Sequence, residues 1–322
     1  MEQGKKTPED VYDTIIIGGG PAGLTAGLYA ARARMNVLLI ESLSVMGQAT
    51  MTDMIENYPG VEKASGIELI DTFKKQAVSF GLSTGTGTVK SLSLSEKEGF
   101  PVWSVEDENG TREALSVIVA TGAIPKKLEV PGEEEFLGKG ISYCATCDAA
   151  FFRENDIVVV GGGDTAVEEA LFLTRFGKKV TLIHRRDRLR AAKILQEKAL
   201  SSEKMEFVWD TVVKEIAGSD KIEKVKLENV KTGEASELSC DGVFIFAGWR
   251  PNTDFLNGIL KLSEKNCIVV DQEMKTSEKG VFACGDCCHK ALHQVVTACG
   301  DGAIAANSAQ QYVDELKGIA YR

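Results

Sequence analysis

Residues 14–23 read TIIIGGGPAG, and residues 157–166 read IVVVGGGDTA. Each stretch is an apolar, largely β-branched run that ends in a glycine-rich turn, and a helix-like pattern follows it. The G-x-G-x-x-G/A spacing is carried by Gly18, Gly20 and Gly23 in the first stretch, and by Gly161, Gly163 and Ala166 in the second. Such a turn brings the backbone close to a pyrophosphate at a helix N-terminus. The repeat therefore predicts two dinucleotide-binding units.

The strand that follows each turn indicates which dinucleotide binds there. NVLLIE ends at Glu41 and KVTLIH ends at His184, each near the roughly 20-residue distance expected for the residue that contacts the ribose. Glu41 would accept hydrogen bonds from ribose hydroxyls and repel a 2′-phosphate, which favours FAD or NAD. The second strand is followed by Arg185, Arg186 and Arg190, which suit the 2′-phosphate of NADP. The alternative is that these arginines only form a solvated basic face.

The bulk composition is that of a soluble protein with more than one domain. The chain has 322 residues, of which 43% are hydrophobic and 26% charged. A net charge of -10 argues against nucleic acid as a partner. Neither a membrane-spanning run nor a signal-type N-terminus is recognisable, so we expect a cytoplasmic protein without a membrane partner. In that compartment the eight cysteines are expected to be thiols, redox groups or ligands.

Residues 141–148, ISYCATCD, contain a C-x-x-C pair formed by Cys144 and Cys147. This spacing is typical of a redox-active dithiol, and Asp148 directly after it is placed to exchange a proton with a thiolate. The alternative is half of a zinc site, for which the nearest candidates to complete it are Cys284, Cys287, Cys288 and His289. No ordinary zinc-finger or zinc-ribbon spacing supports that alternative, so no metal is expected.

The order of these segments predicts α/β architecture with two Rossmann-like three-layer nucleotide-binding domains, the second inserted in the first. The first domain would comprise residues 1–124 and 251–322, and the second residues 125–250. The C-terminal part contains one strand within residues 280–286 and a helical pattern from about Ala298 to Leu316, too little to fold alone. Gly and Pro near both crossings suit a hinge.

Taken together, these motifs make the chain resemble the low-molecular-weight, bacterial-type thioredoxin reductases, a class of pyridine nucleotide-disulfide oxidoreductases. The resemblance extends over nearly the whole chain and rests on motifs that occur in family order: GGGPAGLTAGLYAARA, ENYPG, ATGA, CATCD, GGGDTAVEEALFL, IHRRDRLRA and HQVVTACGDGAIAA. It implies an NADPH-dependent flavoenzyme that reduces thioredoxin or a thioredoxin-like protein, acts as a homodimer, and rotates one domain between half-reactions.

The resemblance also assigns roles to individual residues. Those expected to hold FAD are Gly18, Gly20, Pro21, Ala22, Glu41, Gln48, Asn57, Thr121, Gly122, Asp286, His293, Gln294 and Val295. Those expected to hold NADPH are Gly161, Gly163, Asp164, Thr165, His184, Arg185, Arg186 and Arg190. Cys147 is expected to face the flavin, Cys144 to attack the acceptor disulfide, and Asp148 to donate a proton.

The chain departs from the family pattern in three places. Met46 precedes Gly47-Gln48 where a second glycine is usual, and His293 stands where the family usually has Arg. The histidine would alter the charge, and hence the redox potential, at the flavin. Cys287 and Cys288 are expected to be small buried residues, or an oxidation-sensitive pair with Cys284.

Three other functions fit parts of the same pattern. A related reductase could be fed by NADH or ferredoxin, but the arginine cluster speaks against this. The reductase component of a peroxide-reducing system usually carries an extra dithiol domain, which this chain lacks. A non-enzymatic redox sensor would not need the intact CATCD motif.

Overall fold

The computed structural model describes residues 8–42, 47–52, 55–256 and 258–320. The chain divides into two compact units. Unit 1 comprises residues 1–124 and 250–322, and unit 2 comprises residues 125–249. Both units are α/β with parallel strands at their centres, which confirms the predicted fold class.

Unit 1 is built on a seven-stranded sheet of order β3-β2-β1-β6-β5-β4, with β17 added beside β6. β1, β2, β3, β6 and β17 pair in parallel, and β4, β5 and β6 pair as antiparallel neighbours. The strands are β1 (Val11–Ile17), β2 (Val37–Glu41), β3 (Ser83–Thr86), β4 (Ser91–Lys97), β5 (Phe100–Asp107), β6 (Gly110–Val119) and β17 (Val281–Ala283). The apolar runs lie in the parallel part because those strands are covered on both faces.

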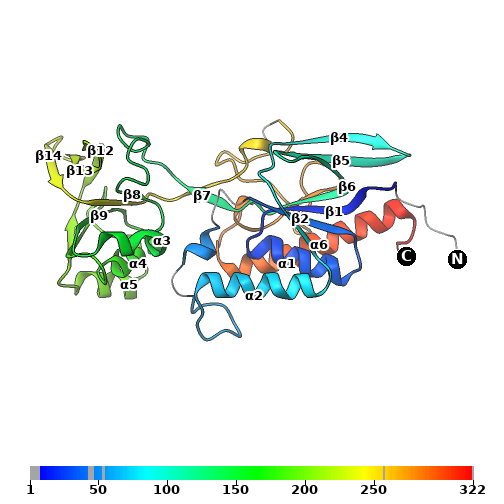
Figure 1. The fold of residues 1–322 in the computed structure, drawn as a ribbon, viewed down its shortest axis with the longest axis horizontal. Helices are drawn as coiled ribbons and strands as arrows, with labels where there is room; N and C mark the ends of the chain where they lie inside the picture. The colour runs from blue at the N-terminus through cyan, green and yellow to red at the C-terminus, as the bar shows by residue number, and fades with distance from the viewer. Residues whose placement is uncertain (1–7, 43–46, 53–54, 257, 321–322) are drawn as a thin grey trace. The chain divides into compact units, whose positions relative to one another are not determined.

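Three helices cover one face of this sheet: α1 (Pro21–Arg32), α2 (Gly66–Ser79) and α6 (Val295–Lys317). Alanines of α1 and α6 pack with Ile16, Leu39 and Ile118 of the strands. α1 and α6 lie next to each other under the sheet (Figure 1), and their small side chains let the two helices approach closely. A second core, which includes Trp103 and Leu256, covers the other face. Unit 1 therefore has the three layers that were predicted.

Unit 2 has a five-stranded parallel sheet of order β11-β10-β9-β15-β8. Its elements are β8 (Ile141–Ser142), β9 (Asp156–Gly161), β10 (Lys179–Ile183), β11 (Met205–Val208), β15 (Gly242–Phe246), α3 (Ala145–Asp148), α4 (Asp164–Leu173) and α5 (Lys193–Leu200). A three-stranded antiparallel sheet comprises β12 (Thr211–Gly218), β13 (Ile222–Asn229) and β14 (Ala235–Ser239). Separate apolar cores lie on the two faces of the parallel sheet.

The chain crosses between the units twice, and the two crossings pair with each other. β7 (Ala123–Pro125) and β16 (Trp249–Pro251) form a two-stranded ribbon. At one end the Asn252 N–H donates to the Gly122 carbonyl (3.0 Å), and at the other the Lys126 N–H donates to the Gly248 carbonyl (2.8 Å). Gly122 and Gly248 have φ of 64° and 115°, a backbone region that favours glycine.

Two elements of the C-terminal segment differ from the sequence-based expectation. α6 begins at Val295 instead of near Ala298, because Gln294 and Thr297 form a capping box before the apolar pattern starts. The strand expected within residues 280–286 covers only Val281–Ala283, because Gly285 (φ 78°) turns the chain into the short 3₁₀ helix η4 (Gly285–Cys287). Within the described ranges, no helix is long and apolar enough to span a bilayer.

Candidate cofactor and disulfide sites

The first glycine turn combines close packing with one open position. A Cβ atom on Gly18 would lie 2.3 Å from the Ala120 carbonyl oxygen, and one on Gly23 would lie 1.9 Å from the Gly18 oxygen. A Cβ on Gly20 would meet nothing within 4 Å. Gly18 and Gly23 therefore bring strand and helix together, whereas the space at Gly20 is open to a ligand. α1 begins directly afterwards with Pro21 and Ala22, and no side chain caps it, so its first N–H groups are available to an anion.

Glu41 ends β2 beside this turn. A Cβ on Gly19 would lie 2.5 Å from the Glu41 carboxylate, so the two are in direct contact. Lys74 of α2 donates to that carboxylate over 2.9 Å, an interaction that no sequence motif indicated. The pair is partly exposed, and Lys74 holds Glu41 at the turn, while the Glu41 carboxylate keeps further acceptor capacity.

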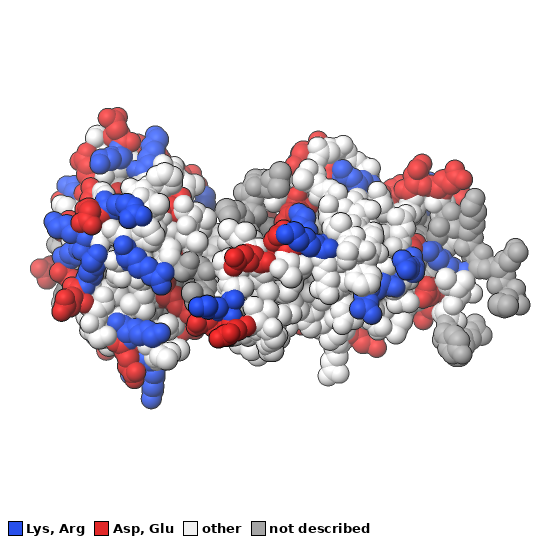
Figure 2. Space-filling model, turned by 60° about the horizontal axis from the view of Figure 1, so that its bottom comes forward, with Lys and Arg blue, Asp and Glu red and all other residues white. Residues whose placement is uncertain are grey.

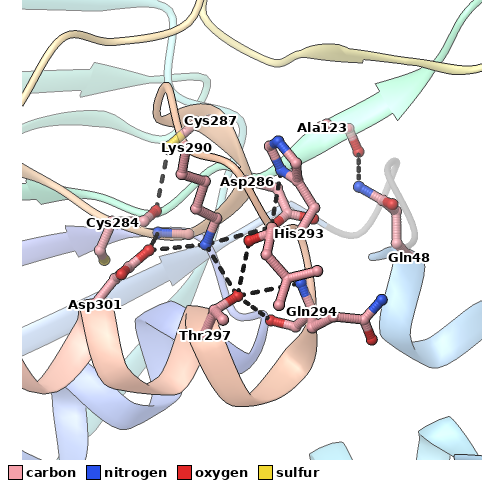
Figure 3. Close-up of polar contacts among 12 residues, drawn as sticks. Gln48, Ala123, Cys284, Asp286, Cys287, Lys290, His293, Gln294, Thr297 and Asp301 are labelled. Carbon is pink, nitrogen blue, oxygen red and sulfur yellow. Dashed lines mark hydrogen bonds and ion pairs between the residues drawn. The ribbon is translucent and has the colours of Figure 1, made fainter.

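A charged cluster lies between η4 and α6 (Figure 3). The Lys290 ammonium is 2.8 Å from Asp301 Oδ2 and 3.7 Å from Asp286 Oδ1. His293 Nδ1 is 3.4 Å from the same Asp286 oxygen. Asp286 Oδ1 is buried and has no hydrogen-bond partner among the described residues. The sequence pointed to Asp286 and His293 but missed Lys290 and Asp301.

The remaining residues expected near the flavin also belong to unit 1. Gln48, in the 3₁₀ helix η1 (Gln48–Met51), donates to the Ala123 carbonyl over 3.2 Å, and Asn57 Nδ2 donates to Gln294 Oε1 over 2.9 Å. The Thr121 hydroxyl donates to the Asn252 carbonyl over 2.7 Å, so it binds the second crossing segment. Gly122 begins the connecting ribbon, Val295 begins α6, and Met46 lies outside the described residues.

The second glycine turn is also tightly packed. A Cβ on Gly161 would lie 2.5 Å from the Ala166 Cβ, which explains the small residue at the end of this motif. The turn leads into α4, whose first two residues are Asp164 and Thr165. The Arg190 N–H donates to the Gly162 carbonyl (2.7 Å), and Asp164 Oδ1 accepts from the Ala192 N–H (2.7 Å). These bonds hold the segment after β10 against the turn, and Arg190 Nη2 would lie 3.1 Å from a Cβ on Gly163.

The cationic residues of unit 2 gather beside this turn. His184 follows β10, and its Nε2 is buried without a hydrogen-bond partner. Burial lowers the His184 pKa, and the nearby charges of Arg185 and Arg186 lower it further. Arg185, Arg186 and Arg190 are exposed, and no carboxylate of the described chain forms an ion pair with them. On the face shown in Figure 2, basic and acidic side chains are interspersed.

Cys144 and Cys147 form a disulfide with a Cα–Cα distance of 5.4 Å. Cys144 is the N-cap of α3, and its sulfur accepts from the Cys147 N–H over 3.2 Å. Cys144 is buried (8% exposed) and Cys147 is exposed, so Cys147 is the more accessible cysteine of the pair in this state. Asp148 is the last residue of α3, and its N–H donates to the Cys144 carbonyl. Phe151, in the 3₁₀ helix η2 (Ala149–Phe152), is 80% exposed.

A buried carboxylate that no sequence motif indicates supports the disulfide segment. Glu133 is 2% exposed and accepts from the N–H groups of Leu128 and Glu129, over 2.8 and 2.6 Å. It also accepts from the hydroxyl of Tyr143 over 2.6 Å. Burial and the Glu133 charge both raise the pKa of Tyr143, which therefore remains a donor. Since Tyr143 directly precedes Cys144, this bond anchors the start of the redox segment.

The other cysteines are free thiols in this structure. Cys284, Cys287 and Cys288 are at most 2% exposed, which confirms their expected burial. Cys284 packs in the core on the helix side of the sheet, whereas Cys287 and Cys288 pack in the opposite core. In the part of the chain that the structure describes, no group of three His, Cys, Asp or Glu side chains is arranged to hold a metal ion.

Comparison with known proteins gives a consistent result. Residues 12–302 match the family model of the pyridine nucleotide-disulphide oxidoreductases. Thioredoxin reductase of Peptoclostridium litorale is 47% identical over 315 residues, covering 96% of this chain and 99% of the relative. Thioredoxin reductase of Bacillus subtilis is 46% identical over 310 residues, covering 96% and 97%.

Solved structures of thioredoxin reductases have the same fold. The crystal structure of the Lactococcus lactis enzyme superimposes with a TM-score of 0.89 at 46% identity, over 95% of this chain and 100% of that one. The T. acidophilum enzyme gives a TM-score of 0.87 at 32% identity, over 96% and 100%.

Proposed function

Because the chain belongs to the low-molecular-weight thioredoxin reductases of the pyridine nucleotide-disulphide oxidoreductase family, we propose that it uses NADPH and FAD to reduce thioredoxin or a thioredoxin-like protein. It is accordingly a thioredoxin-disulfide reductase. The observation that carries the finer proposal is the Cys144–Cys147 disulfide on the unit that also contains the arginine-flanked glycine turn.

Unit 1 is proposed to hold FAD. The open space at Gly20, the uncapped start of α1 and the acceptor Glu41 fit the pyrophosphate and ribose of its adenosine half. The unpartnered Asp286 Oδ1 fits a hydroxyl donor, as the sugar chain of the flavin would supply. The flavin side is assigned to Gln48, Asn57, Thr121, Gly122, His293, Gln294 and Val295. When bound, FAD would supply the two-electron chemistry that links a nicotinamide nucleotide to a disulfide.

Unit 2 is proposed to hold NADPH at its glycine turn. The N-terminus of α4 and the backbone of Gly161–Gly163 suit the pyrophosphate, with Asp164 and Thr165 beside it. Arg185, Arg186 and Arg190 have no carboxylate to neutralise them in the described chain, so they are free to bind the 2′-phosphate. A neutral His184 in the same place suits a sugar hydroxyl or phosphate oxygen.

The cysteines are proposed to act in a fixed order. Two electrons break the Cys144–Cys147 bond, with entry at the exposed Cys147, and Asp148 exchanges the proton that accompanies thiolate formation. The Cys144 thiolate then attacks the acceptor disulfide, forming one mixed disulfide and releasing one acceptor thiolate. Cys147 displaces the second acceptor thiolate and re-forms the original bond. Since Cys144 is buried in the oxidised state, the segment must open before an acceptor protein can reach it.

A rotation of unit 2 about the connecting ribbon is proposed to separate the two half-reactions. The ribbon is short, and Gly122 and Gly248 lie at its two ends with positive φ. Locking the units with a chemical cross-link should preserve either cofactor reduction or thioredoxin reduction, but not both. Full turnover after complete cross-linking would refute the rotation.

Phe151 is proposed as part of the surface that meets the acceptor protein. A phenylalanine that is 80% exposed four residues after Cys147 is unusual on a surface that contacts only solvent. Homodimerisation is also proposed from exposed apolar side chains. On the covering helices of unit 1 these are Tyr29, Ile67, Val78 and Ile304.

The free thiols indicate the compartment. Six free thiols favour a reducing compartment, so we propose that the enzyme is cytoplasmic.

A coupled turnover assay tests the proposed function. Purified protein loaded with FAD is mixed with oxidised thioredoxin and either NADPH or NADH. Oxidation of the nucleotide is followed by absorbance, with thioredoxin as the limiting reactant. NADPH-dependent reduction of thioredoxin is expected, with NADH much less effective. A protein that takes up no flavin, or that oxidises NADPH without reducing the acceptor, would contradict the proposal.

A further inference from the structure

The segment between η4 and α6 contains an ammonium group enclosed by acceptors. Lys290 is 15% exposed, and its Nζ lies 2.8 Å from Asp301 Oδ2, 3.5 Å from Thr297 Oγ1 and 3.7 Å from Asp286 Oδ1 (Figure 3). A lysine side chain on a surface normally keeps its ammonium in water. Here the ammonium turns inward between two carboxylates, toward the residues that we assign to the flavin.

The Asp301 carboxylate binds both the backbone of η4 and the Lys290 side chain. Its Oδ2 accepts from the Gly285 N–H over 3.2 Å and from Lys290, so one carboxylate ties the start of η4 to the second turn of α6. Thr297 accepts from the Gln294 N–H (3.2 Å) and donates to the Leu292 carbonyl (3.0 Å). The whole loop from η4 to α6 is therefore held around Lys290.

Asp286 is the acidic side chain that Lys290 holds beside the proposed FAD site. Its Oδ1 is buried and unpartnered, and an ionised carboxylate in that state is costly unless a cation lies nearby. The Lys290 ammonium lies 3.7 Å from this oxygen. Among the described residues, the only other basic group within 4 Å of it is His293, at 3.4 Å. Lys290 is thus one ammonium shared by two carboxylates, those of Asp286 and Asp301.

We propose that Lys290, held by Asp301, is a positioning residue for bound FAD, which orients Asp286 and the start of α6 and sets the charge beside the cofactor. The inference rests on the proposed function, because it requires FAD in unit 1. Removing the ammonium leaves two carboxylates without the lysine that lies between them, so Asp286 moves and loses its orientation. The added negative charge also disfavours the reduced, more negative state of the cofactor.

Four variants separate this role from ordinary stabilisation. Lys290→Met removes the charge and keeps most of the apolar stem, Lys290→Arg keeps the charge, and Asp301→Asn removes the anchor. Lys317→Met is the matched control, because Lys317 forms a 2.6 Å ion pair with Asp13, at 20% and 9% exposure, at the other end of α6. FAD affinity is measured by flavin fluorescence after reconstitution, the midpoint potential by anaerobic dye equilibration, and stability by urea unfolding.

Lys290→Met is expected to weaken FAD binding at least tenfold. It should weaken binding of the reduced cofactor about tenfold more than that of the oxidised one, which for a two-electron couple lowers the potential by about 30 mV. Asp301→Asn should shift both readouts in the same direction, and Lys290→Arg should restore most of both. Lys317→Met should lower stability and leave affinity and potential at their wild-type values.

The inference is overturned if Lys290→Met and Asp301→Asn keep wild-type FAD affinity and potential, or if Lys317→Met shifts both as far as they do. Equal shifts for Lys290→Arg and Lys290→Met would also overturn it, because charge would then not be the cause. A wild-type protein that binds no FAD would refute the proposed function itself. The two failures are therefore distinguishable.

Discussion

Replacing Arg185, Arg186 and Arg190 together by Gln should abolish the preference for NADPH over NADH that we propose for this enzyme. In the described chain none of the three forms an ion pair with a carboxylate, so the substitutions break no internal salt bridge. They remove only charges that a 2′-phosphate would meet. The glycine turn would keep its shape, because the Arg190–Gly162 bond is made by the backbone.

The magnitude follows from the exposure of the three side chains. Hydrogen bonds to charged groups contribute roughly 1.5–3 kcal/mol when shielded, but exposed pairs contribute about 1 kcal/mol or less because solvent screens them. Three contacts of about 1 kcal/mol each contribute about 3 kcal/mol to the binding free energy of NADPH. Every 1.4 kcal/mol of binding free energy changes the affinity about tenfold. The KM for NADPH should therefore rise about 100-fold while that for NADH stays within about twofold.

Anaerobic stopped-flow bleaching of the flavin absorbance by each nucleotide measures this directly. Arg175→Gln is the matched control, because Arg175 is an exposed arginine of unit 2 that lies over the Phe172 ring beyond the C-terminus of α4. Raising the salt concentration should lower the NADPH preference of the wild type and of the control, but not of the triple variant. If the triple variant kept its ratio of NADPH to NADH efficiency, the phosphate would have to bind elsewhere.

Three further outcomes are expected. Cys144→Ser and Cys147→Ser should each abolish thioredoxin reduction while the purified protein stays yellow, as absorbance spectra would show; loss of colour would mean that the cysteines act on cofactor binding. Phe151→Ala should raise the KM for thioredoxin about tenfold without slowing reduction by NADPH, whereas Val230→Ala, at another exposed apolar residue of unit 2, should change neither; equal effects would remove Phe151 from the docking surface. Burial raises the pKa of Cys240 from 9.0 to about 12, so between those values only the unfolded chain ionises and stability falls as pH rises. Urea unfolding of Cys240→Ala should show a pH slope shallower by about 1.4 kcal/mol per pH unit, and an unchanged slope would mean that this thiol ionises in the folded state.

The fold could be predicted because its decisive signals are local. A β-branched run, a glycine turn and a helical pattern lie within about 20 residues of each other, and each repeats once. The insertion could be inferred because the C-terminal strand and helix are too small to fold alone. The apolar pattern predicts the start of α6 too late, because the capping box of Gln294 and Thr297 has no apolar periodicity.

The parts of the sites that the sequence missed depend on contacts between distant segments. Glu133 looks like any surface glutamate until folding brings Tyr143 and two backbone N–H groups to it. Lys290 and Asp301 have no motif spacing, because a loop and one helical turn lie between them. The residues of the glycine turns were found from the sequence because the close approach of backbone to backbone restricts them directly.

The pairing of the two crossing segments means that unit 2 enters and leaves unit 1 at a single point. The Gly122 carbonyl and the Asn252 N–H are already 3.0 Å apart, so a short loop could join them without disturbing the unit 1 sheet. A gene with residues 123–251 replaced by such a loop should encode unit 1 alone, with the residues that we propose for FAD still in place. Another nucleotide or disulfide module could be grafted at the same place. Unit 2 is thus a contiguous insertion that could be exchanged without interrupting the sheet of unit 1.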